Sequence, residues 1–283
     1  MLNKIRIYLE MIKFEHTVFA LPFALAAAFV ASNGIPEYII ILWIVLAVVG
    51  ARTSAMTFNR IADHKYDALN PRTQNRAIPQ GAISIQSAWF FLLLSSAIFF
   101  YSAYKLNNLT LYLSPLAFAA IIFYSYLKRF TCLSHLWLGM CLSIAPMGAW
   151  IAVTGKFDII PIFLCGAVLF WTAGFDIIYS LQDVEFDKEN NLKSLASKHG
   201  CEKALFVSRF FHGAAIILLI LFGLFAGLRT IYQIGVIFAG AALIFEHTLV
   251  LCDDLSKVNT AFFTVNGFIS IGVMLFIIAD VLL

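Results

Sequence analysis

Charged residues are scarce in this sequence. Only 12% of its 283 residues are Asp, Glu, Lys or Arg, while 61% are hydrophobic. Soluble domains average about a quarter charged residues. This shortage excludes a water-soluble enzyme, a nucleic-acid-binding module and a disordered chain. The composition instead predicts an integral membrane protein that crosses the bilayer several times.

Cysteine patterns are also missing. The five cysteines are scattered, and none stands in a C-x-x-C pair or in a spacing that suits zinc. Most lie within apolar runs, where a free cysteine behaves as a small hydrophobic residue. We therefore predict no disulfide framework. The first apolar run is not followed by a small-residue cleavage site, so we expect a retained helix rather than a signal peptide.

Long apolar runs are what the sequence has in abundance. A membrane-spanning helix needs about 20 mostly apolar residues. Nine such runs are found, near residues 16–32, 38–58, 88–104, 110–127, 136–154, 159–181, 204–228, 231–251 and 260–282. Two connections between them, 59–87 and 182–203, are long and polar. The chain is therefore expected to be all-α, a polytopic bundle of nine transmembrane helices forming one domain over residues 1–283.

The basic residues predict an orientation. If the N-terminus is cytoplasmic, fourteen Lys and Arg residues fall on the cytoplasmic side and three on the other. Such an excess is typical of cytoplasmic loops. Both long polar connections then face the cytoplasm.

A faint internal repeat carries the first functional signal. Asp63 and Asp67 follow the second span, and Asp183 and Asp187 follow the sixth, 120 residues later. Four spans separate the two D-x-x-x-D pairs, which predicts two parallel four-span pseudo-repeats with both pairs on one membrane face. Asn59 lies one helical turn before the first pair.

These acidic residues are typical of a magnesium site. Like charges four residues apart repel on a helix, and a divalent cation is the simplest compensation. Oxygen ligands without nitrogen or sulfur suit Mg²⁺, which also shares its coordination with phosphate. Basic residues that match the remaining phosphate oxygens stand nearby. They are Arg60, Lys65, Arg72 and Arg76 in the first polar connection, and Lys128 and Arg129 in a short loop on the same side.

A diphosphate at the end of an apolar bundle indicates a lipid-like substrate. With its leaving group stabilised by metal and cations, an allylic C–O bond can ionise, and aromatic faces can stabilise the carbocation. Tyr124 and Tyr179 are predicted at suitable depth.

The motifs resemble those of the UbiA-type intramembrane aromatic prenyltransferases. The stretch NRIADHKYD followed by NPRTQNRAIPQG is similar to the first motif of that family, and WTAGFDIIYSLQDVEFDKENNLKS is similar to the second. The element YSYLKR between them also matches. The resemblance covers residues 59–194 in order, with nine spans around it.

The resemblance implies a helical bundle around a central cavity and a Mg²⁺-dependent active site on the cytoplasmic side of a bacterial inner membrane. It implies transfer of a polyprenyl chain from a polyprenyl diphosphate to the ring of an aromatic acid, in ubiquinone or menaquinone biosynthesis. By position, it assigns the metal–diphosphate site to Asn59, Asp63, Asp67, Asp183 and Asp187, phosphate contacts to Arg72, Lys128 and Arg129, and the cavity wall to Asp176 and Tyr179.

One position departs from the family pattern. Arg60 stands where an aspartate is usual, so either one metal loses an anionic ligand or Arg60 binds phosphate directly. The N-terminal stretch KFEHTVFALPFA also differs from the best-known members. Both features resemble a bacterial subgroup named 4-hydroxybenzoate polyprenyltransferases, some of which resemble naphthoate prenyltransferases. The acceptor is therefore 4-hydroxybenzoate or, alternatively, a dihydroxynaphthoate. Glu15 and His16, at the start of the first span, are candidates to meet the acceptor and take its ring proton.

A membrane transporter is the alternative from a different class, since membrane carboxylates also couple ions. Transporters place them near the midplane, whereas here both pairs stand at span ends beside basic loops. Glu246 and His247 lie within the eighth span without a match to the motifs, and no role is assigned to them.

Overall fold

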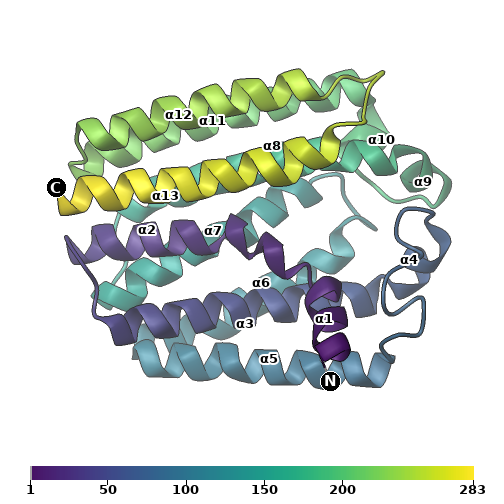
Figure 1. Cartoon of the computed structure of the whole chain (residues 1–283), viewed down its shortest axis with the longest axis horizontal. Helices are drawn as coiled ribbons and strands as arrows, with labels where there is room; N and C mark the ends of the chain where they lie inside the picture. Colours follow the sequence, from purple (N-terminus) through teal and green to yellow (C-terminus); the bar gives the residue numbers. More distant parts are fainter. Residues whose placement is uncertain (1) are drawn as a thin grey trace.

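Nine helices in the described part of the chain are long and apolar enough to cross a membrane, which confirms the predicted all-α fold. The computed structural model describes residues 2–283, with side chains from Arg6 onward. The spans are formed by η1 (Phe14–Phe19) with α2 (Leu21–Ser32), α3 (Tyr38–Ala62), α5 (Ile85–Leu106), α6 (Asn108–Leu127), α7 (Ser134–Thr154), α8 (Ile160–Ser180), α11 (Cys201–Ala226), α12 (Thr230–Leu249), and η3 (Thr260–Val265) with α13 (Asn266–Leu282). Their axes run side by side (Figure 1).

Short helices interrupt both long polar connections. The first contains α4 (His64–Leu69), and the second contains η2 (Leu181–Asp183), α9 (Val184–Glu189) and α10 (Leu195–His199). Figure 1 shows α4, α9 and α10 at the same end of the bundle. A further short helix, α1 (Leu2–Met11), precedes the first span. The polar segments after the second and sixth spans therefore meet at one end, as the spacing predicts.

The first aspartate of each pair lies where a helix ends, Asp63 after α3 and Asp183 at the end of η2, which follows α8. Asp63 has φ −101° and ψ 7°, and Asp183 has φ −108° and ψ 6°. These angles lie in the bridge region, outside the regular α-helix. The backbone N–H of Asp67 still donates to the Asp63 carbonyl at 2.8 Å. The first acidic stripe therefore turns at the helix end without losing its four-residue spacing.

Small residues allow the closest helix contacts. At Gly139 of α7, an added Cβ would lie 2.2 Å from the carbonyl oxygen of Leu169 on α8. At Gly50 of α3, it would lie 2.9 Å from the backbone nitrogen of Phe99 on α5. Without a hydrophobic driving force in lipid, such close packing is a main source of helix association. The acid-bearing helices α3 and α8 are thus each held tightly by a neighbour.

The apolar core lies mainly to one side of the bundle. Phe23, Trp171, Phe175 and Phe222 belong to its largest cluster, which α2, α8, α11, α12 and α13 share. Many large apolar side chains on the outer faces are exposed, as expected for surfaces in contact with lipid. The helices α3, α6 and α7 on the other side enclose a cavity instead of packing solidly.

The absence of disulfides predicted from the sequence is wrong. Cys201, at the start of α11, is bonded to Cys252, with 5.8 Å between their Cα atoms. The two lie 51 residues apart in sequence, and the α11–α12 hairpin returns the chain to the same end of the bundle. The spacing of cysteines along the chain does not reveal which of them lie close together in the fold.

Candidate active site

A cavity of about 900 Å³ opens beside the acidic segments and extends between the helices. Its body is lined by apolar side chains from α3, α5, α6, α7 and α8, among them Ile44, Phe99, Leu113 and Ile144. Its polar end is lined by Asn59, Asp63, Asp67, Asp183 and Asp187. A polar mouth on an apolar body suits a molecule with a charged head and a hydrocarbon tail.

The loop that follows the first acidic pair binds directly to the second. Arg72 holds Asp183 with two hydrogen bonds, Nε to Oδ1 at 2.9 Å and Nη2 to Oδ2 at 2.6 Å. Asn70 Nδ2 also donates to Asp183 Oδ1, at 3.1 Å. The two acidic segments therefore face each other across the cavity mouth, as the internal repeat predicts.

Two more arginines neutralise the first pair. Arg76 Nη1 lies 2.6 Å from Asp67 Oδ1, and Arg129 Nη2 lies 3.1 Å from Asp63 Oδ1. Asn59 Nδ2 donates to the other oxygen of Asp63 at 2.9 Å. Burial raises the pKa of Asp63 above its usual value, although the hydrogen bond from Arg129 opposes the change. A cationic partner such as Arg129 therefore stabilises the ionised form of this carboxylate.

Lys128 brings to the site a cation without an acidic partner in the part of the chain that the structure describes. It lines the cavity and has no acidic partner within 4 Å among the described residues. Burial alone would lower the pKa of Lys128, but the surrounding carboxylates, Asp187 and Asp176 foremost, outweigh burial and raise it. The ammonium stays charged and keeps its three donors for a ligand.

The acidic side chains fit Mg²⁺ by their chemistry. Asp67 Oδ2 and Asp187 Oδ2 are buried without a hydrogen-bond partner, one in each acidic pair. Burying a carboxylate oxygen without a partner costs free energy unless a cation binds to it. Among the described residues, however, no three acidic, His or Cys side chains are grouped closely enough to hold an ion. The arginines described above hold three of the four carboxylates instead.

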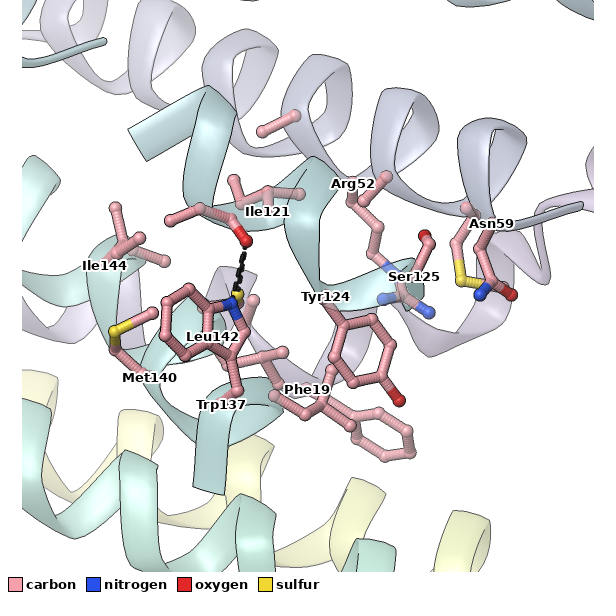
Figure 2. Close-up of a pocket in the computed structure, with 18 of the residues that line it drawn as sticks. Phe19, Arg52, Asn59, Ile121, Tyr124, Ser125, Trp137, Met140, Leu142 and Ile144 are labelled. Atoms are coloured by element: carbon pink, nitrogen blue, oxygen red, sulfur yellow. Dashed lines mark hydrogen bonds between the residues drawn. The ribbon is translucent and has the colours of Figure 1, made fainter. Parts of the chain in front are cut away.

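The two predicted tyrosines line the cavity. Tyr179 lies under the guanidinium of Arg72, whose Cζ is 5.3 Å from the ring centre, and its hydroxyl accepts from Arg72 Nη1 at 3.0 Å. Tyr124 comes from α6 and lies beside Ser125 in Figure 2. Both rings therefore border the volume next to the acidic mouth.

The departure at Arg60 has a structural consequence. Arg60 is buried and lines the cavity, with Nε donating to the Met11 carbonyl at 3.2 Å and Nη1 donating to Asn59 Oδ1 at 3.2 Å. The only amide oxygen of Asn59 is thus already bound. Asn59 is the weakest candidate among the predicted metal ligands.

Two of the residues predicted for the site do not line the cavity. Lys65 is exposed on α4 and is absent from the cavity lining. Glu15 is also exposed and lies 3.7 Å from Lys13. Its neighbour His16 does line the cavity and packs against Phe19 and Phe262.

Arg52 is a cavity residue that sequence reasoning missed. It lines the cavity from within α3, and its Nε is buried without a hydrogen-bond partner. Figure 2 shows its guanidinium beside Ser125, whose Oγ is also unpartnered. The sequence contained a signal for this residue, since an arginine inside an apolar span indicates a functional site.

Asp176 lies in the cavity wall as the motif predicts, but its partner was not foreseen. Asp176 Oδ2 is 2.7 Å from Nδ1 of the buried His135 on α7. The other in-span pair, Glu246 and His247, lies away from the cavity lining. Glu246 Oε1 accepts from Asn266, and His247 contacts His212.

Comparisons with known proteins agree with this geometry. The model of the UbiA prenyltransferase family matches residues 20–271. The 4-hydroxybenzoate octaprenyltransferase of Francisella tularensis subsp. mediasiatica is 30% identical over 258 residues, covering 90% of this chain and 88% of that protein. The 4-hydroxybenzoate octaprenyltransferase of Tolumonas auensis is 30% identical over 224 residues, which cover 79% of this chain and 78% of that protein.

Solved structures share the fold. The apo structure of a UbiA homolog from Aeropyrum pernix is 34% identical, with a TM-score of 0.86 over 95% of this chain and 98% of its own. A UbiA homolog from Archaeoglobus fulgidus bound to GPP and Mg²⁺ is 21% identical, with a TM-score of 0.78 over 97% and 99% of the two chains. At 21% identity, this similarity shows a shared fold and no more.

Proposed function

Because this chain belongs to the UbiA prenyltransferase family, we propose that it transfers a polyprenyl chain from a polyprenyl diphosphate to a ring carbon of an aromatic carboxylic acid, with Mg²⁺. The favoured acceptor is 4-hydroxybenzoate, because curated relatives at 30% identity are named 4-hydroxybenzoate octaprenyltransferase. A dihydroxynaphthoate is the alternative. Family membership and the placement of the acids at helix ends argue against the transporter.

The observation that carries this proposal is the meeting of two acidic pairs at the mouth of an apolar cavity. Arg72 crosses from the loop after the first pair to Asp183 of the second. The cavity of about 900 Å³ has room for an isoprenoid tail, and Lys128 offers donors at its head. The charged head and the apolar tail of a prenyl diphosphate match the polar mouth and the apolar body of this cavity.

The acidic oxygens would hold the metal. Asp67 and Asp187, whose Oδ2 atoms lack partners, are the first candidates, followed by Asp63 and Asp183. When bound, Mg²⁺ supplies a Lewis acid that neutralises the departing diphosphate. Support comes from the related fold bound to GPP and Mg²⁺. Arg72 and Arg76, now paired with aspartates, are placed to turn their guanidinium forks to phosphate oxygens.

The aromatic wall stabilises positive charge on the isoprenoid. When the C–O bond breaks, the electron pair leaves with the diphosphate and the prenyl C1 becomes cationic. Tyr124 and Tyr179 border the volume next to the mouth, and the faces of their rings attract cations. The apolar body of the cavity keeps water away from this cation.

Arg52 supports an acidic acceptor. It lies seven residues before Asn59 on α3, which places it about 10 Å deeper along the helix axis. A carboxylate bound to the Arg52 guanidinium and the Ser125 hydroxyl would satisfy both unpartnered groups. The aromatic ring of such an acid would then extend toward the diphosphate end. Both candidate acceptors carry a carboxylate, so Arg52 does not choose between them.

A product assay in membranes tests the proposal. Membranes containing the protein are offered one polyprenyl diphosphate with 4-hydroxybenzoate and a dihydroxynaphthoate in parallel, and products are read by mass spectrometry. We expect a prenylated acid that disappears with a chelator and returns with added Mg²⁺. A membrane preparation of folded protein that prenylates neither acid contradicts the proposal.

The metal assignment has its own test. Asp183→Ala removes a carboxylate from the acidic mouth, and we expect product formation to fall by about 10²-fold or more, as when a group that stabilises the leaving charge is lost. The control is Glu185→Ala, an exposed acid on α9 that does not line the cavity. Full activity of Asp183→Ala in the presence of chelator would remove the metal from the proposal.

A further inference from the structure

The cavity wall contains one buried acid–histidine pair that the proposed function leaves without a role. Asp176 on α8 and His135 at the start of α7 meet at 2.7 Å, and the side chains are 13% and 2% exposed. Asp176 lines the cavity, whereas His135 does not. His135 therefore reaches the cavity only through Asp176.

A backbone contact fixes the tautomer of His135. The N–H of Leu195, the first residue of α10, points at His135 Nε2 at 3.4 Å. An N–H can only donate, so Nε2 is the acceptor and Nδ1 carries the ring proton. The neutral imidazole then donates Nδ1–H to Asp176 Oδ2. This hydrogen bond holds the Asp176 carboxylate in one orientation.

The second oxygen of Asp176 remains available. Oδ2 accepts from His135, and Oδ1 has no hydrogen-bond partner among the side chains described. The carboxylate retains some exposure to the cavity. Tyr124 and Lys128 line the same cavity from α6 and the loop after it. The pair thus presents a carboxylate oxygen whose direction is fixed by a buried donor.

Asp176 also lies at the right depth. It precedes Asp183 by seven residues, so it lies about 10 Å inside the acidic mouth along α8. Arg52, on the parallel helix α3, precedes Asp63 by eleven residues, or about 16 Å. An aromatic acid anchored at Arg52 and extending toward the diphosphate places its ring in the band that Asp176 borders.

We propose that Asp176 is the base that removes the ring proton during prenylation, and that His135 is the positioning residue that holds its carboxylate aimed into the cavity. The inference rests on the proposed function. The prenyl C1–O bond breaks and its electron pair leaves with the diphosphate. A ring carbon then forms the new C–C bond, and its C–H electrons return to the ring while the proton passes to Asp176 Oδ1.

The test compares three variants with ring-deuterated acceptor. Asp176→Asn removes the base, His135→Leu removes the donor at similar volume, and His135→Asn restores an N–H donor. We expect kcat to fall by about 10²-fold or more in Asp176→Asn and by about 10- to 100-fold in His135→Leu. In both, a deuterium isotope effect on kcat appears, while the KM for the polyprenyl diphosphate changes little. His135→Asn recovers most of the activity.

The outcomes separate this inference from the proposed function. The acceptor is whichever of the two aromatic acids the wild-type protein prenylates. If it prenylates neither, the proposed function fails and this inference fails with it. If the wild type is active but His135→Leu and Asp176→Asn show no isotope effect, or lose activity only through KM, the inference alone is overturned. Thermal denaturation in detergent checks that each variant is folded, and a His135→Asn variant as poor as His135→Leu also contradicts the positioning role.

Discussion

The side chain of Arg52 brings a positive charge into an apolar cavity without a counter-charge. No acidic group lies within 4 Å of it among the described residues, and its Nε lacks a hydrogen-bond partner. An unpaired buried charge costs several kcal/mol. Such a residue is retained where a ligand supplies the missing anion. By contrast, Arg72, Arg76 and Arg129 at the cavity mouth already have aspartate partners.

Arg52→Leu tests this role. A hydrogen bond to a charged group contributes about 1.5–3 kcal/mol, so we expect the KM for the aromatic acid to rise by roughly 10- to 100-fold. The KM for the polyprenyl diphosphate should change little. Because an unpaired charge is removed, the ligand-free variant should also unfold at a higher temperature.

The matched control is Arg209→Leu, which removes an arginine from another span, α11. Arg209 is exposed on α11 and does not line the cavity. Steady-state kinetics with each substrate varied in turn should show wild-type values for this control. An unchanged acceptor KM in Arg52→Leu would assign the carboxylate subsite elsewhere.

Lys128 allows a second prediction for a single side chain. Its raised pKa keeps the ammonium charged throughout the neutral range, and Lys128→Met removes that charge from a cluster of carboxylates. We expect weaker binding of the polyprenyl diphosphate, seen as a KM at least about tenfold higher. Lys188→Met, on the exposed face of α9, is the control. Equal KM values for the two variants would contradict the diphosphate role of Lys128.

At the scale of the elements, close helix contacts fix the acid-bearing helices. The contact of α7 with α8 is closest at Gly139, where an added Cβ would meet the Leu169 carbonyl at 2.2 Å. The backbone of Leu169 cannot move aside as a flexible side chain can. The two helices must therefore separate to make room for a methyl group at Gly139. This contact therefore helps to hold Asp176 against His135.

Gly139→Ala should lower the unfolding temperature in detergent and reduce activity together. Gly213→Ala on α11 is the matched control, because nothing lies within 4 Å of its added Cβ. Alanine favours helix over glycine by about 0.5–1 kcal/mol, so the control should be unchanged or slightly more stable. Thermal unfolding followed by circular dichroism distinguishes the two. A Gly139→Ala protein as stable as wild type would show that the helices can separate at little cost.

At the scale of the whole molecule, the disulfide and the acidic mouth lie at the same end of the bundle. Cys201 begins the helix that follows α10, close in sequence to the second acidic pair. The basic residues place this end in the cytoplasm by the positive-inside rule, which remains a prediction. Disulfides are rare in most cytoplasms but occur in those of hyperthermophiles. Orientation and disulfide therefore have to be tested separately.

Removal of the disulfide should destabilise the molecule without changing its chemistry. Cys252→Ser opens a cross-link that spans 51 residues. The chain-entropy treatment gives about 4 kcal/mol for a loop of this size, an upper value because the membrane already restrains the unfolded chain. We expect a lower unfolding temperature and wild-type KM values. Identical melting of oxidised wild type and Cys252→Ser would contradict a stabilising role.

Orientation is tested with a cysteine introduced at an exposed position. Lys188→Cys on α9 lies beside the acidic mouth. A membrane-impermeant maleimide should label it in inside-out vesicles and not in intact cells. Labelling in intact cells would reverse the predicted orientation.

The nine spans follow from the amino-acid sequence alone, because a bilayer requires about 20 apolar residues per helix wherever the chain crosses it. The sequence also predicts that the two acidic pairs lie at the same end of the bundle, since Asp63 and Asp183 follow equivalent spans. The contacts of each polar group, by contrast, depend on how the helices pack together. Arg72 binding Asp183, the pairing of His135 with Asp176, the outward position of Lys65 and the Cys201–Cys252 bond all join or separate side chains through helix packing. Periodicity reports the face of a single helix, whereas these contacts depend on how neighbouring helices are rotated and how closely they approach.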